Sequence, residues 1–281
     1  MTLYFAYGSN LNVADWTKWC NDFGFNPEGM TEICPAWLPG YSLKFHYYSQ
    51  GRGGGAADVV KTETGCAVPG VLFELDDKAL AAMDEKEGHP KYYQRKWVDI
   101  CCPNGDSKKA LTYTVVQSKL QPNYIQPTDS YIELISSGLK KRGLPISDLV
   151  NAIEDEASHF PIKDVFVYGT LLSGESRAPI IKNLNGILIS DATCEGVLVD
   201  LGSYPGLLIG TELVRGELYE FEDLKTALQR LDSIEGVDAG LYRRHIISVE
   251  TDIGPQWAWT YFYNGEEKNN QIESGSWKNR N

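Results

Sequence analysis

The feature that most constrains the fold of this 281-residue chain is that its sequence spells one pattern twice. "YFAYGSNL" at residues 4–11 is answered by "VFVYGTLL" at 165–172. Four further pairs follow in the same order: VPGVLFEL (68–75) with VRGELYEF (214–221), MDEKEG (83–88) with LDSIEG (231–236), YYQRKWVDI (92–100) with LYRRHIISV (241–249), and ALTYTV (110–115) with AWTYFY (258–263). Several motifs repeated in one order indicate an internal duplication.

The spacing between the copies supports the duplication. Gly216 follows Gly70 by 146 residues, and Glu235 follows Glu87 by 148. The Tyr-Gly turns are 161 residues apart, so the first copy has about a dozen more residues between its turn and its Glu. We expect these extra residues within residues 15–30.

Each copy has the pattern of an α+β domain. Runs of β-branched and aromatic residues alternate with Gly, Pro and Asp turns, which predicts a meander of strands. Apolar residues at helical spacing, followed by Gly, predict one helix at residues 76–88 and another at 222–236. Two more short helices are expected within 129–158. We therefore predict two domains, residues 1–160 and residues 161–281, the second ending in a polar tail at 265–281.

Composition excludes several classes of partner and cofactor. The net charge is −12 without a basic stripe, which argues against nucleic acid and anionic membranes as partners. The sequence has no apolar run long enough to span a membrane and no signal-peptide pattern at its start. The six cysteines and four histidines form no metal-ligand spacing, and the glycine-rich stretch 51–58 lacks the Lys-Ser/Thr of a phosphate loop. We expect a cytoplasmic protein with reduced thiols that needs no metal, nucleotide or other cofactor.

The repeated Tyr-Gly-hydroxyl turn is the first candidate for chemistry. Gly permits a tight backbone, and successive N–H groups at a strand-turn-helix junction can converge on an anion. The alternative is an N-cap, in which Ser9 or Thr170 only satisfies a helix terminus. Because Tyr and Gly are intact in both copies, we favour a cradle for a carboxylate or another anion.

The repeated acid is the second candidate. Glu87 and Glu235 each precede the Gly that ends the predicted helix. A carboxylate at a helix C-terminus is electrostatically unfavourable, so its repetition there favours a functional role over a solvated surface charge.

Taken together, the YGSNL/YGTLL turn, the V-x-G strand, the (M/L)-D-x-x-E-G helix end and the Tyr-x-Arg strand resemble the gamma-glutamylcyclotransferase-like superfamily. The first half resembles its gamma-glutamylcyclotransferase branch. The second half, with GVLVDLGSYPGLL at 196–208, resembles the gamma-glutamylamine cyclotransferase (AIG2-like) branch. The resemblance implies two mixed β-barrels with flanking helices, one per copy.

The resemblance also implies the activity and the residues that carry it. Such enzymes release 5-oxoproline and an amine, amino acid or peptide from a gamma-glutamyl substrate. The family's acid-base residue maps onto Glu87 and Glu235. The substrate-binding residues map onto the turns and onto the Tyr at matching positions of the last repeated strand: Tyr7, Gly8, Ser9, Asn10, Leu11 and Tyr113, and Tyr168, Gly169, Thr170, Leu171, Leu172 and Tyr261.

The reaction that this implies needs only groups on the chain and the substrate. The substrate's α-amine attacks its own γ-carbonyl, and a Glu moves the proton to the leaving nitrogen. The alternative is a module in which one or both barrels bind a gamma-glutamyl or amino-acid-like ligand without turnover. The partner is a small gamma-glutamyl compound or a carrier-bound one, and we expect a monomer in which the two barrels pair as an internal pseudo-dimer.

Overall fold

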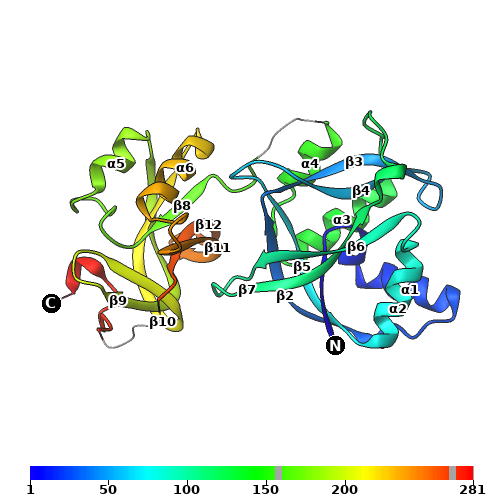
Figure 1. Cartoon of the computed structure of the whole chain (residues 1–281), viewed down its shortest axis with the longest axis horizontal. Helices are drawn as coiled ribbons and strands as arrows, with labels where there is room; N and C mark the ends of the chain where they lie inside the picture. The colour runs from blue at the N-terminus through cyan, green and yellow to red at the C-terminus, as the bar shows by residue number, and fades with distance from the viewer. Residues whose placement is uncertain (156–159, 266–269, 281) are drawn as a thin grey trace. The chain divides into compact units, whose positions relative to one another are not determined.

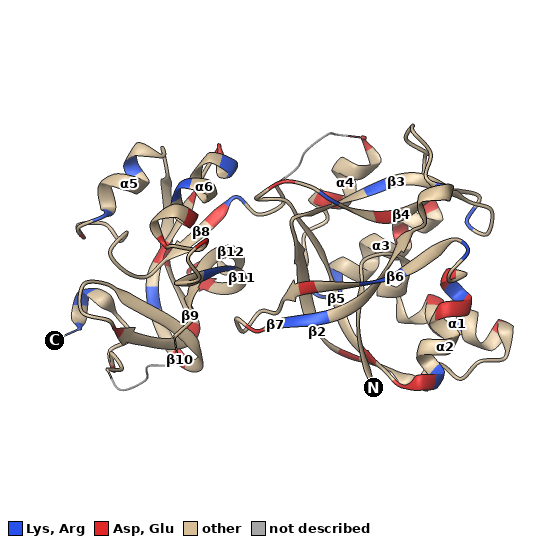
Figure 2. Cartoon of the chain, in the orientation of Figure 1, with Lys and Arg blue, Asp and Glu red and all other residues tan. Residues whose placement is uncertain are grey.

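The computed structural model describes residues 1–155, 160–265 and 270–280. The chain forms two compact units: Met1–Ile100 with Ser107–Pro161, and Cys101–Asp106 with Ile162–Asn281. Figure 1 shows a barrel with flanking helices in each, and Figure 2 shows basic and acidic residues intermixed over the elements of both. Within the described ranges, no helix is both long and apolar enough to cross a bilayer.

A closed five-stranded barrel forms the centre of the first unit. Its strand order is β1-β5-β2-β6-β7, with β1 antiparallel to β5 and parallel to β7. Large apolar side chains, among them Phe5, Trp37 and Phe73, are fully buried, as expected for a small barrel whose interior is filled by side chains. The strands are β1 (Thr2–Ala6), β2 (Met30–Pro39), β5 (Ala67–Leu75), β6 (Tyr93–Cys101) and β7 (Ser107–Val115).

Helices and one hairpin surround this barrel. Strands β3 (Tyr41–Ser49) and β4 (Gly54–Lys61) pair with each other in a separate two-stranded sheet. The predicted helix at 76–88 is α2 (Asp77–Glu87), and the two expected within 129–158 are α3 (Asp129–Lys140) and α4 (Ser147–Ile153); residues 156–158 of that span lie outside the described residues. A further helix, α1 (Val13–Phe23), follows the first turn.

The second unit repeats the barrel with the same connectivity. Its order, β10-β8-β12-β11-β9, becomes that of the first barrel when β8, β9, β10, β11 and β12 replace β1, β2, β5, β6 and β7. The predicted tandem α+β fold of two mixed barrels is thus confirmed. The elements are β8 (Asp164–Val167), α5 (Ala178–Asn183), β9 (Ile187–Asp200), β10 (Pro205–Glu220), α6 (Leu224–Ile234), β11 (Tyr242–Thr251) and β12 (Gly254–Tyr263).

Strand pairing shows where the first copy is longer. Ala36 pairs with Gly70 in the first barrel, and Ala192 pairs with Gly216 in the second. Thirty-four positions separate the first pair and twenty-four the second, so ten extra residues lie between β2 and β5, where the β3–β4 hairpin is built. The expectation that the extra residues lie within 15–30 is wrong for these ten residues. The repeated motifs do not reveal a hairpin that lies between two of them.

Candidate active sites in the two barrels

Each repeated Glu lies at the end of a helix that Gly terminates. Glu87 is the last residue of α2, and Gly88 follows it with a φ of 62°. Glu235 directly follows α6, and Gly236 has a φ of 63°. Only Gly adopts this left-handed conformation without strain, so the chain turns away at the same point in both copies. Both carboxyl groups are consequently held, partly buried, at the helix end.

In the first barrel the turn and the Glu come together. Asn10 Nδ2 donates to Glu87 Oε1 (2.7 Å) and lies 2.8 Å from the Tyr4 hydroxyl. Burial raises the pKa of Glu87 above its ordinary value, although Lys86, Asn10 and Arg52 oppose the shift. Glu87 is therefore a stronger base than a solvated glutamate.

Glu87 is bordered by a charged cluster, which could not be identified from the sequence. Arg52 Nη2 donates to Ser9 Oγ (2.9 Å) and pairs with Asp15 (3.0 Å), and Lys86 Nζ reaches the same carboxylate (2.8 Å). The Arg52 guanidinium also lies 5.2 Å from the centre of the Tyr131 ring. Two cations share one Asp, so the cluster has a positive charge to offer to a bound anion. Arg52 belongs to the glycine-rich stretch 51–58, and its single Arg was the available signal.

Ser9 does not cap a helix. The 3-10 helix η1 (Ser9–Leu11) has no side-chain cap, and Asn12 caps α1 instead. In the second barrel the turn is followed by residues without helix until α5 begins at Ala178. The prediction that a helix starts directly after the turn is therefore wrong for the second copy. In the first copy, the Ser9 hydroxyl accepts a hydrogen bond from Arg52 instead of capping a helix.

The hydroxyl groups of the turn tyrosines brace each site. Tyr7 Oη donates to the Tyr113 carbonyl oxygen (2.6 Å), and Tyr168 Oη donates to that of Tyr261 (2.6 Å). Both turn tyrosines are only 7% exposed. These two hydrogen bonds hold each turn against the last strand of its barrel.

The same strand tyrosines also fasten the helix that carries Glu. Tyr113 Oη donates to Asp84 (2.8 Å), which Arg95 also contacts. In the second barrel Tyr261 Oη donates to Asp232 (2.9 Å), which pairs with Arg244. Each Asp is three residues before its Glu, so this Tyr–Asp–Arg contact positions the helix end.

Room around Glu87 is generous. It lines two open cavities, of about 460 Å³ and about 720 Å³. Ser9 is the predicted turn residue that lines the smaller of the two. Asn10 and Leu11 are buried behind it, and Leu11 packs closely against Gly138 of α3.

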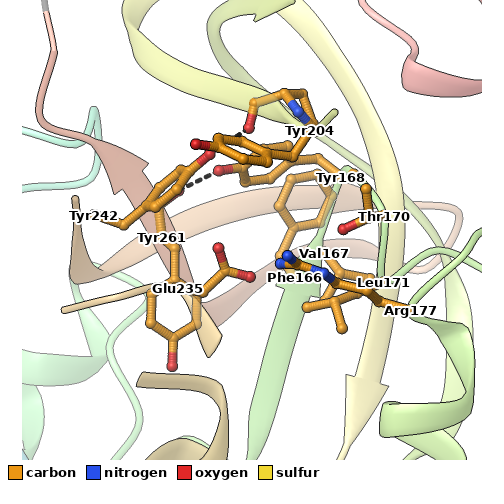
Figure 3. A pocket seen from close by; sticks show the side chains of 12 residues that line it. Phe166, Val167, Tyr168, Thr170, Leu171, Arg177, Tyr204, Glu235, Tyr242 and Tyr261 are labelled. Atoms are coloured by element: carbon orange, nitrogen blue, oxygen red, sulfur yellow. Dashed lines mark hydrogen bonds between the residues drawn. The ribbon is translucent and has the colours of Figure 1, made fainter. Parts of the chain in front are cut away.

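The second site is narrow and has fewer charged side chains in its lining. Its cavity measures about 30 Å³ and is lined by Glu235, Arg177 and the predicted Tyr168, Gly169, Thr170, Leu171 and Tyr261, whereas Leu172 faces a different cavity. Figure 3 shows the Glu235 carboxyl and the Arg177 guanidinium pointing into the same space, with the rings of Tyr204 and Tyr242 above. Burial raises the pKa of Glu235 to about 7, with Arg177 opposing.

The two sites differ at matching positions. Asn10 of the first turn corresponds to Leu171, and Lys86 corresponds to Ile234. Each site nevertheless has an Arg near its Glu, supplied by the β3–β4 hairpin in one barrel and by the residue before α5 in the other. Among the described side chains, no group of three or more His, Cys, Asp or Glu is arranged to hold a metal ion.

Comparisons with known proteins agree with this architecture. The family model "Gamma-glutamyl cyclotransferase, AIG2-like" matches residues 4–133 and 165–279. The chain is 37% identical over 110 residues to the gamma-L-glutamyl-butirosin B gamma-glutamyl cyclotransferase of Niallia circulans, covering 37% of this chain and 69% of that one. It is 38% identical over 117 residues to a putative gamma-glutamylcyclotransferase of Vibrio cholerae, covering 41% and 96%. A solved gamma-glutamyl cyclotransferase is similar with a TM-score of 0.45 and 26% identity, covering 56% and 88%.

Proposed function

The chain belongs to the gamma-glutamyl cyclotransferase, AIG2-like family, and from this premise we propose that it cleaves gamma-glutamyl amides by cyclisation, without a cofactor. The products are 5-oxoproline and the amine, amino acid or peptide that the γ-carbonyl carried. The observation that carries the proposal is that each barrel contains one partly buried Glu of raised pKa, next to an Arg, at the same point of a duplicated fold.

The proposed reaction balances within one substrate molecule. The α-amine nitrogen bonds to the γ-carbonyl carbon, a five-membered ring closes, and the amide C–N bond breaks. One proton leaves the amine and one reaches the departing nitrogen, and a single carboxyl group can move it between them. Because the nucleophile and the electrophile share one molecule, holding the folded conformer supplies much of the rate acceleration.

The raised pKa suits a group that both accepts and donates a proton. A solvated Glu at neutral pH is a weak base and is rarely protonated. Burial disfavours the charged form of Glu87 and raises the pKa of Glu235 to about 7. A carboxyl group whose pKa lies closer to neutral pH can both accept and donate a proton under the same conditions. Either residue can then take the proton from the amine and return it to the leaving nitrogen.

The neighbouring Arg would hold the glutamyl head. Arg52 with Ser9 in the first barrel, and Arg177 with Thr170 in the second, offer donors for the α-carboxylate. A guanidinium can bind a carboxylate through two parallel hydrogen bonds, which fixes orientation as well as charge. In the first barrel both Nη atoms of Arg52 already donate to Asp15 (3.2 and 3.0 Å), so the α-carboxylate would meet the remaining N–H donors of this guanidinium together with Ser9.

The test is the release of 5-oxoproline from a panel of gamma-glutamyl amino acids, amines and peptides. Glu87→Gln and Glu235→Gln should each lower turnover at one site by roughly 10²–10⁴-fold, because Gln keeps the shape but cannot carry the proton. The double variant should be inactive. Asp99→Asn and Glu222→Gln, which change exposed carboxylates on β6 and before α6, are the matched controls.

The same panel tests the alternative of a binding module. A double variant with wild-type turnover would remove the proposed roles of both Glu residues. Binding of panel compounds without any 5-oxoproline would replace the enzyme with a module that only holds its ligand.

A further inference from the structure

The first site has a second cavity that the head of the substrate does not need. We propose, resting on the function proposed above, that the β3–β4 hairpin builds a leaving-group subsite for aromatic amino acids, so that the first barrel cleaves gamma-glutamyl aromatic amino acids and the second is confined to small leaving groups. In the second barrel, the place of this hairpin is taken by residues 201–204 between β9 and β10.

Glu87 stands between the two cavities of the first barrel. The smaller cavity contains Ser9 and Arg52, the donors for the glutamyl head. The larger contains neither of them, but shares five lining residues with the smaller: Ser49, Gly51, Lys86, Glu87 and Tyr93. Since the acid must lie next to the leaving nitrogen, a substrate whose head binds Arg52 directs its leaving group past Glu87 into the larger cavity.

The wall of this larger cavity is aromatic. Tyr47 of β3 meets the edge of Tyr93 with ring centres 5.6 Å apart, and lies 6.4 Å from the centre of the Tyr92 ring. Tyr92 is 36% exposed, whereas Tyr93 is 8% exposed. Ring faces and edges at these spacings are the partners that another aromatic ring prefers.

The charge on this wall favours a leaving group with a carboxylate. Lys119 lines the cavity, and its Nζ lies 5.2 Å from the centre of the Tyr92 ring. Lys91 Nζ lies at the same distance from that ring. Glu85 also lines the cavity, while Lys86 is committed to Asp15. The two acids that line the cavity, Glu85 and Glu87, belong to α2, whereas Lys119 lies at the aromatic wall. Lys119 can therefore pair with the carboxylate of an aromatic amino acid, which the corresponding amine lacks.

Among the described residues around Glu235, the second barrel has no cavity of comparable size. Its cavity measures about 30 Å³, compared with about 460 Å³ and about 720 Å³ for the two cavities at Glu87. Tyr242 Oη donates to the Pro205 carbonyl oxygen (2.5 Å), which joins the two walls on this side of the pocket. The walls must move apart to admit any substrate, and a small leaving group requires the least movement.

The experiment reads each site separately through the Glu variants. Glu235→Gln protein reports the first site, and Glu87→Gln protein reports the second. Three substrates are compared by 5-oxoproline release: gamma-glutamyl-phenylalanine, gamma-glutamyl-alanine and gamma-glutamyl-phenethylamine. In Glu235→Gln protein, kcat/KM for gamma-glutamyl-phenylalanine should be roughly tenfold higher than for gamma-glutamyl-alanine, because only the former has a ring that contacts the wall. It should be roughly threefold higher than for gamma-glutamyl-phenethylamine, because only the phenylalanine compound has a leaving-group carboxylate. Glu87→Gln protein should prefer alanine.

Two variants test the subsite, each with a matched control. In the Glu235→Gln background, Tyr47→Leu should bring the phenylalanine-to-alanine ratio close to one while alanine turnover persists. Lys119→Met should bring the phenylalanine-to-phenethylamine ratio close to one. The controls are Tyr41→Leu and Lys96→Met, a second lysine–tyrosine pair (4.9 Å), which is not among the residues lining either cavity.

The outcomes separate this inference from the function on which it rests. Unchanged ratios in Tyr47→Leu and Lys119→Met, equal changes in the controls, or a phenylalanine preference in Glu87→Gln protein would each overturn the subsite while leaving the enzyme intact. Release from other panel compounds but from none of these three would also overturn the subsite alone. If wild-type protein released no 5-oxoproline from any compound of the panel, the proposed function itself would fail, and the subsite with it.

Discussion

Replacing Glu235 by Gln should change how the stability of the protein depends on pH. Burial raises the pKa of this carboxyl from its ordinary 4.5 to about 7 in the folded chain. Below about pH 4.5 the group is protonated whether the chain is folded or unfolded. As the pH rises towards 7 the unfolded chain ionises first, so the stability present at low pH is progressively lost, and the loss is complete above pH 7.

The magnitude follows from the size of the shift. A shift of one pKa unit corresponds to about 1.4 kcal/mol, so a shift from 4.5 to about 7 is worth roughly 3 kcal/mol in full, of which about 2.5 kcal/mol falls between pH 5 and pH 8. Gln cannot ionise and does not experience this loss. The free energy of unfolding of Glu235→Gln protein, relative to wild type, should therefore rise by about 2.5 kcal/mol between these pH values.

Urea unfolding of the full-length proteins at pH 5 and pH 8 measures this difference. Comparing the variant with wild type at each pH cancels the titration of every other group, as well as any change in packing that does not depend on pH. Glu222→Gln, which removes an exposed carboxylate, should show no such trend. An equal difference between Glu235→Gln and wild type at both pH values would show that the pKa of Glu235 is not raised in the folded chain.

Three further predictions concern separate parts of the molecule. In Glu87→Gln protein, kcat/KM should rise by at least about tenfold per pH unit below about pH 7 as Glu235 ionises, because the ionised carboxylate accepts the proton of the attacking amine; a pH–rate profile without this acid limb would contradict the role of Glu235 as base. In Glu235→Gln protein, Asn10→Leu should move the acid limb of the pH–rate profile of the first site to higher pH, because the ionised Glu87 loses the hydrogen bond that Asn10 donates. An unmoved limb would show that this hydrogen bond does not lower the pKa of Glu87. Leu228→Ala, at a fully buried position of α6, should lower the free energy of unfolding by about 2–5 kcal/mol in urea, far more than Leu241→Ala at a position 37% exposed; similar losses would argue against α6 packing on the barrel through Leu228.

Much of the fold of this protein could be predicted because its sequence motifs occur twice. Residues that recur with constant spacing, such as Tyr113 and Tyr261, occupy equivalent positions and donate to equivalent Asp residues. The ends of α2 and α6 followed from the Gly that the left-handed conformation requires. The duplication also indicated the two Glu residues, since a carboxylate repeated at a helix C-terminus is unusual on electrostatic grounds.

The cations of the two sites could not be predicted in the same way. Arg52 comes from a hairpin between β2 and β5, and Arg177 comes from the residues before α5, so no alignment of the two copies brings them together. The salt bridge between Asp15 and Lys86 joins residues 71 positions apart in the sequence. Such pairs depend on how loops return to the barrel mouth, and that is a property of the tertiary fold rather than of local pattern.

The division between a shared frame and unshared pocket walls gives the duplication a physical logic. The contacts that aim each Glu are strand-to-turn and strand-to-helix hydrogen bonds, such as Tyr7 to Tyr113 and Tyr168 to Tyr261, and any change in them would disturb the barrel as well as the site. The walls of the pockets are made by connections between strands, where insertions are tolerated at little thermodynamic cost. Two copies of one barrel can therefore keep the same acid in the same place while the hairpin that carries Tyr47 opens one site and Pro205 narrows the other. Under the proposed function, the change in specificity that this architecture permits most easily is a different leaving group on the same glutamyl head.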